Sequence, residues 1–158
     1  MVFLKKILVT TDLSDFSLAA MEYATSFGTL YTSRLYLLYV LDGREGHHGK
    51  EGPPKNEDEA RKNLEEFVHA NVPADTRITL VVKKGVAAEE IRRFAEDEGI
   101  DLIVIATHGR TGLRHMLLGS VAERIVRYSG IPVLTVKPHP FRESILQEED
   151  VEKELHLR

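Results

Sequence analysis

Short runs of β-branched and aliphatic residues alternate along this chain with longer stretches in which apolar residues recur every three or four positions. The short runs contain few polar residues, which is typical of strands covered on both faces. They predict five strands, at residues 6–10, 35–41, 78–82, 102–106 and 132–136.

The longer stretches predict four helices, because their apolar residues fall on one face at 3.6 residues per turn. These stretches follow Ser14, Asn56, Gly85 and Ser120, and Ser14 is a good candidate for the N-cap of the first helix. The apolar stripes are Phe16, Ala20, Ala24, Phe27; Ala60, Leu64, Phe67, Val68; Ala87, Ile91, Phe94, Ala95; and Val121, Ala122, Ile125, Val126 with Ser129.

Regular alternation of strands and helices predicts an α/β fold, a five-stranded parallel sheet with helices on both faces. We expect the strand order 3-2-1-4-5 and one domain over residues 1–138. A Gly- and Pro-rich segment, 42–55, is expected to be a surface loop. Residues 139–158 are expected to form an acidic C-terminal tail, helical or arm-like, because from Phe141 onward they hold six acidic and three basic side chains.

Composition restricts the class of protein further. With 42% hydrophobic and 29% charged residues, the 158-residue chain is typical of a globular protein with its own core. It has no cysteine, which excludes disulfides and thiolate metal sites. A net charge of −4 gives no overall attraction to nucleic acid or anionic lipid. No signal peptide or membrane-length apolar run is recognised, so we expect a cytoplasmic protein.

Polar residues follow the first and fourth predicted strands, whose carboxyl ends flank the switch point of such a sheet. Ligands bind to open α/β sheets at that point. Thr11 and Asp12 end the first strand, and the fourth leads into Ala106, Thr107, His108, Gly109 and Arg110. We expect all of these residues to belong to the ligand-binding site.

Gly119 and Ser120 begin the last predicted helix. A helix N-terminus offers unpaired N–H groups and partial positive charge to a phosphate, and a glycine allows close approach. Neither a Walker A motif nor a G-x-G-x-x-G motif after the first strand is present. A P-loop NTPase and a dinucleotide dehydrogenase are therefore poor fits.

The segment ATHGRTGLRHMLLGSVAERIVRYSGIPVLTVKP at 106–138, together with KILVTTDLS at 6–14 and LYVLD at 38–42, resembles the universal stress protein family. The resemblance implies a Rossmann-like fold of the adenine nucleotide alpha hydrolase type. ATP-binding members carry the signature G-x2-G-x9-G-[ST], which falls here on Ala106, Gly109, Gly119 and Ser120. The departure is Ala106, which stands where the signature has its first glycine.

By this resemblance, Asp12 contacts the nucleoside and the backbone near Val40 reads the adenine edge. Gly109, Gly119 and Ser120 match phosphate-binding positions. Thr107, His108 and Arg110 line the same loop. The ligand implied is ATP, with Mg²⁺ carried on its phosphates and no protein metal site.

Each of these residues also has a purely structural interpretation. Asp12 would then only brace the turn after the first strand, and Gly119 with Ser120 would form an ordinary helix start. His108 is better interpreted as structural than as catalytic. His47 and His48, which invite a metal interpretation, are better explained as solvated side chains because no third ligand is near in sequence.

The function predicted is that of a cytosolic stress protein that binds ATP, hydrolyses it slowly at most, and acts as a switch through an unknown protein partner. The alternative is a family member without nucleotide binding that acts through protein interaction alone. A phospho-acceptor receiver domain is disfavoured because no aspartate ends the strand at 78–82.

A homodimer is also expected, paired through the apolar last strand, with Val133, Leu134 and Val136 at the interface. The alternative is a monomer in which the C-terminal tail covers that edge.

Overall fold

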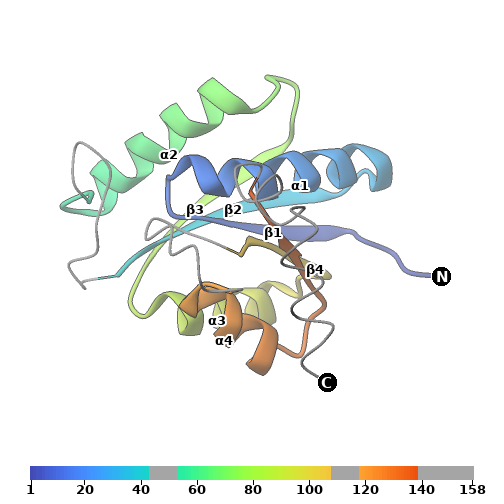
Figure 1. The fold of residues 1–158 in the computed structure, drawn as a ribbon. Coiled ribbons are helices and arrows are strands. Elements are labelled where there is room, and N and C mark those ends of the chain that lie inside the picture. Colours follow the sequence, from blue (N-terminus) through green and yellow to red (C-terminus); the bar gives the residue numbers. More distant parts are fainter. Residues whose placement is uncertain (43–52, 108–117, 139–158) are drawn as a thin grey trace, which may run out of the picture.

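The computed structural model describes residues 1–42, 53–107 and 118–138. It contains one sheet of five parallel strands in the order β3-β2-β1-β4-β5, which confirms the predicted fold class (Figure 1). The strands are β1 (Lys6–Thr11), β2 (Arg34–Leu41), β3 (Ile78–Lys84), β4 (Leu102–Ala106) and β5 (Val133–Val136).

Four α-helices cover the sheet, as predicted. They are α1 (Leu18–Tyr31), α2 (Glu57–Asn71), α3 (Ala87–Glu98) and α4 (Ser120–Tyr128). Helices α1 and α2 lie on one face, whereas α3 and α4 lie on the other (Figure 1).

Each face of the sheet builds its own hydrophobic cluster because successive strand residues point to opposite sides. On β1, Ile7 and Val9 pack under α1 and α2, whereas Leu8 packs under α3 and α4. All three side chains are fully buried. The near-continuous apolar runs in the sequence therefore reflect a sheet that is covered on both faces.

The prediction that Ser14 caps the first helix is wrong. A 3₁₀ turn, η1 (Asp15–Ser17), precedes α1, and the N-cap residue of α1 is Ser17. Ser14 lies before η1, and its side chain donates to the Asp12 carboxylate instead of accepting from a helix N–H group. Because η1 lies between Ser14 and α1, the helix begins at Leu18, too far along the chain for Ser14 to cap its first turn.

Two other helix ends follow the ordinary rules of capping. Asn56 caps α2, since its Oδ1 accepts a 2.9 Å hydrogen bond from the Glu59 N–H group. Gly99 is the C-cap residue that follows α3, and its φ of 62° lies in the left-handed region that favours glycine.

Most of the expected loop and all of the expected tail, at 43–52 and 139–158, lie outside the described residues. No helix within the described ranges is both long enough and apolar enough to cross a bilayer.

Replacing the cap residue tests how α2 is held. We expect Asn56→Ala to lower the free energy of unfolding by about 1 kcal/mol, because the Glu59 N–H group loses its acceptor. Thermal unfolding followed by circular dichroism measures the change. Asn71→Ala is the matched control: Asn71 is exposed and only donates to the Phe67 carbonyl, so we expect a change within about 0.5 kcal/mol. Equal losses in both variants would contradict the capping role.

Candidate functional site

The candidate site is the switch point between the carboxyl ends of β1 and β4, the crevice of an open α/β sheet. The pairing between these strands ends at Val9 and Val104. However, β1 stays paired with β2 as far as Thr11, and β4 stays paired with β5 as far as Ala106. The last two residues of each central strand therefore diverge, at the switch point where open α/β sheets bind ligands.

The β1 side of the crevice ends in Asp12, which is half-buried. Its Oδ1 accepts the Ser14 N–H group at 3.0 Å and also accepts the Ser14 hydroxyl. The carboxylate is therefore held in a fixed orientation by its own turn, as the structural interpretation of Asp12 expects. This does not oppose a binding role, since ligand-binding groups need to be held in place.

Below Asp12, Thr11 and Ser17 join the end of β1 to the start of α1. The two hydroxyl oxygens lie 2.7 Å apart in the interior, and Thr11 Oγ1 also accepts the Leu13 N–H group at 2.9 Å. Leu13 has a φ of 63°, a left-handed conformation that costs a non-glycine residue about 1–2 kcal/mol. The hydrogen bonds of its neighbours hold the chain in this turn.

Val40 lies beside Asp12 at the end of β2. Pairing of β1 with β2 ends at Thr11 and Tyr39, so Val40 is one position beyond it, at the level where Asp12 leaves the sheet. Its side chain is buried in the cluster under α3 and α4. Only the backbone of Val40 is thus suited to contact a ligand at the carboxyl ends of β1 and β2.

The β4 side of the crevice is built around Thr107, which is buried. Its N–H group donates to the Val136 carbonyl at 2.9 Å, and its carbonyl accepts the Gly119 N–H group. These bonds attach the end of β4 to β5 and to the start of α4. Ala106 precedes Thr107 as the last residue of β4 and is half-buried.

Gly119 and Ser120 lie at the start of α4, as predicted, with Gly119 as the N-cap residue. Because the Gly119 N–H group is used by Thr107, the donors without an intrahelical partner are those of the first turn, beginning at Ser120. Gly119 has φ −64° and ψ 155°, which any residue can adopt. A need for glycine here would therefore come from space, not from backbone conformation.

Three predicted loop residues, His108, Gly109 and Arg110, lie outside the described residues, as do His47 and His48. The structure brings Thr11, Asp12 and Val40 to one side of the crevice. It brings Ala106, Thr107, Gly119 and Ser120 to the other. Among the described residues, no three histidine or acidic side chains gather closely enough to bind a metal ion.

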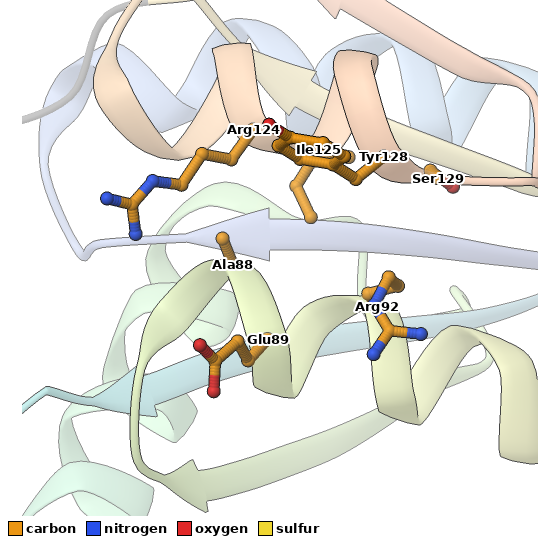
Figure 2. Close-up of a pocket in the computed structure, with 7 residues that line it drawn as sticks. All are labelled: Ala88, Glu89, Arg92, Arg124, Ile125, Tyr128 and Ser129. Carbon is orange, nitrogen blue, oxygen red and sulfur yellow. The ribbon is translucent and has the colours of Figure 1, made fainter.

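A groove of about 390 Å³ between α3 and α4 contains none of the predicted site residues. In Figure 2, Ala88 of α3 faces Ile125 of α4, and the Tyr128 ring lies along the α4 wall. A second groove, of about 280 Å³, lies between α1 and the end of α2. Sequence reasoning missed both, because helix periodicity does not show how closely two helices pack.

Comparison with known proteins adds a family assignment to this geometry. The model of the "Universal stress protein family" matches residues 4–137. Universal stress protein MJ0577 of Methanocaldococcus jannaschii is 34% identical over 156 residues, covering 86% of this chain and 96% of the relative. The solved structure of MJ0577 superposes with a TM-score of 0.72 at 33% identity and covers 86% of this chain and 97% of its own.

Two more distant structures support the fold alone. A universal stress protein from Archaeoglobus fulgidus, solved in complex with dAMP, has a TM-score of 0.63 at 20% identity and covers 87% of this chain and all of its own. A universal stress protein solved in complex with cAMP has a TM-score of 0.60 at 23% identity and covers 84% of this chain and 95% of its own.

Proposed function

This chain belongs to the universal stress protein family, and on that premise we propose that it binds ATP in the β1/β4 crevice. The nucleotide carries Mg²⁺ on its phosphates, and binding switches a protein partner in a cytosolic stress response, with slow hydrolysis at most. One observation carries the proposal: β1 and β4 stop pairing before their ends, and they separate between a held carboxylate and a helix N-terminus.

The nucleoside end of the ligand is assigned to Asp12 and Val40. A carboxylate accepts hydrogen bonds from an amino group or a sugar hydroxyl, and Asp12 is fixed by Ser14 before any ligand arrives. The backbone of Val40, one residue past the last β1 pair, supplies the polar edge for a base.

The phosphate end is assigned to the first turn of α4. Its N–H groups and positive helix end favour an anion, and the Ser120 hydroxyl adds a donor. Ala106, in place of the signature glycine, adds one methyl group at the end of β4. His108, Gly109 and Arg110 are proposed to complete the phosphate contacts.

Two family structures bound to adenine nucleotides, dAMP and cAMP, support an adenine nucleotide as the class of ligand.

Titration with Mg·ATP tests the proposal directly. At free ligand about 100 times the Kd, binding adds about 2.7 kcal/mol to the free energy of unfolding, which raises the Tm by about 5–10 °C. Isothermal titration calorimetry and differential scanning fluorimetry measure heat and Tm, with Mg²⁺ alone as the control. Neither heat nor a Tm shift at millimolar Mg·ATP would refute ATP binding and favour a family member that acts through protein interaction alone.

Gly119→Val tests the phosphate end. We expect affinity for Mg·ATP to fall by at least about tenfold, because a branched side chain at the start of α4 occupies space that the phosphates need. The fold should be kept, since valine can adopt the Gly119 backbone conformation.

Gly130→Val is the matched control for Gly119→Val. Gly130 lies after α4, and a Cβ atom there meets no other atom within 4 Å. We expect this variant to bind Mg·ATP like the wild type. If Gly119→Val binds equally well, the phosphates lie elsewhere.

A homodimer through β5 is the second part of the proposal. β5 is an edge strand, as predicted. The N–H groups of Ile103 in β4 and of Thr107 directly after it donate to the carbonyls of Pro132 and Val136. Because backbone groups of successive strand residues point to opposite edges, those of Val133 and Thr135 face away from β4. Within the described residues no strand pairs with this edge of β5. Such an edge is suited to a second copy.

The side chains at this edge require one correction. Val136 is only 4% exposed and belongs to the chain's own core, so it does not form a free interface surface. Val133 and Leu134 are half-buried. Helices α1 and α4 both pack against β5.

Thr135→Pro tests the dimer by removing an edge-facing N–H group while leaving the β4 ladder intact. In sedimentation equilibrium at micromolar concentration, we expect the wild type and Thr135→Ala to have twice the monomer mass of 17.9 kDa, and Thr135→Pro to be monomeric. A wild-type mass of one chain would exclude the dimer. A dimer that survives Thr135→Pro would place the interface away from β5.

A further inference from the structure

We propose that Ser17, acting with Thr11, is a positioning residue for the nucleoside end of the crevice. The Thr11 hydroxyl, expected from the sequence to bind the ligand, is buried and already bonded to Ser17 and Leu13, so its role is proposed to be indirect. Both hydroxyls act through Ser14 on the Asp12 carboxylate. The inference rests on the proposed function, because it assumes that Asp12 contacts a bound nucleoside.

The direction of the hydrogen bonds in this turn is determined by counting protons. The Ser17 hydroxyl donates to the Ser14 carbonyl at 2.7 Å, so its single proton is used. Across the 2.7 Å contact between the two hydroxyl oxygens, Thr11 must therefore be the donor. Thr11 Oγ1 in turn accepts the Leu13 N–H group. The bonds thus run in one direction, from Leu13 through Thr11 and Ser17 to Ser14.

This chain of bonds ends on the residue that holds Asp12. The Ser14 carbonyl accepts from both the N–H group and the hydroxyl of Ser17, which ties Ser14 to the start of α1. The N–H group and hydroxyl of Ser14 both donate to Asp12 Oδ1. The orientation of the carboxylate is therefore linked, through Ser14, to the Ser17 hydroxyl.

Ser17 serves this network instead of its helix. It is the N-cap residue of α1, where a serine side chain usually accepts a hydrogen bond from an N–H group of the first turn. Here Ser17 makes no such cap bond. The side chains of Ser17 and Thr11 are both buried, so water does not readily replace either hydroxyl. The Ser17 hydroxyl bonds to Thr11 and Ser14 within the turn and not to the first turn of α1, so it is suited to fixing the geometry of the turn.

Loss of the Ser17 hydroxyl should weaken nucleotide binding only through Asp12. A double-mutant cycle with wild type, Ser17→Ala, Asp12→Ala and the double variant measures this coupling. We expect Ser17→Ala to weaken Mg·ATP binding about threefold to tenfold in the wild-type background. In the Asp12→Ala background, we expect a change of less than about twofold.

Thr11→Val provides a second route, because valine keeps the shape of threonine and removes the donor to Ser17. We expect the same loss and the same dependence on Asp12. Ser26→Ala is the matched control: it is the same substitution in α1, but Ser26 is exposed and bonds only to the Glu22 carbonyl. We expect it to leave binding unchanged.

A further readout separates positioning from general damage to the crevice. Adenosine and tripolyphosphate, tested as competitors of Mg·ATP, report on the nucleoside and phosphate ends separately. Ser17→Ala should weaken competition by adenosine and leave tripolyphosphate unchanged. If the role of Ser17 were merely structural, Ser17→Ala would weaken competition by adenosine and by tripolyphosphate to the same extent.

Each outcome decides one claim. If the wild type does not bind Mg·ATP, the proposed function fails. Suppose that the wild type binds Mg·ATP but the effects of Ser17→Ala and Asp12→Ala on affinity simply add, or that Ser17→Ala weakens competition by adenosine and by tripolyphosphate equally. Then only the positioning role fails. If neither Ser17→Ala nor Thr11→Val folds, as judged by circular dichroism, the hydroxyls are structural and the positioning role is overturned.

Discussion

The early end of the pairing between β1 and β4 is the constraint on which the candidate site depends. After β1 the chain turns to α1 on one face of the sheet, and after β4 it leads to α4 on the other. Strands whose continuations leave toward opposite faces cannot stay paired to their ends, so pairing stops at Val9 and Val104. The crevice is a consequence of sheet topology, and the residues beside it supply the chemistry.

The two walls of the crevice are held by different means. On the β1 side, side-chain hydroxyls brace a short turn that contains a left-handed leucine, Leu13. On the β4 side, a backbone hydrogen bond holds the wall, because the Thr107 carbonyl accepts the Gly119 N–H group. The start of α4 is fixed against the end of β4 by this bond.

Polar groups near the crevice are buried without being left unpaired. Thr11 and Ser17 bond to each other and to the backbone. Within the described ranges, no buried side-chain nitrogen or oxygen lacks a partner. An unmade hydrogen bond in the interior costs about 1–3 kcal/mol, so this network also limits which substitutions the turn accepts. Stability and placement of Asp12 thus depend on the same few atoms.

The sequence by itself determined the kinds of elements, their order and the strand order, because hydrophobic periodicity and the topology rules for parallel sheets are local or general. It also placed Thr11, Asp12, Ala106 and Gly119 correctly near the carboxyl ends of β1 and β4. Tertiary structure alone decided which polar atoms are already engaged: Ser14 with Asp12 instead of a helix cap, and Gly119 with Thr107. It also decided that Val136 is core and that α3 and α4 leave a groove. The Gly119–Thr107 bond, the burial of Val136 and the groove depend on distances between residues far apart in the chain, which no local pattern encodes. The Ser14–Asp12 bond is local, but it depends on where α1 begins, which hydrophobic periodicity did not locate.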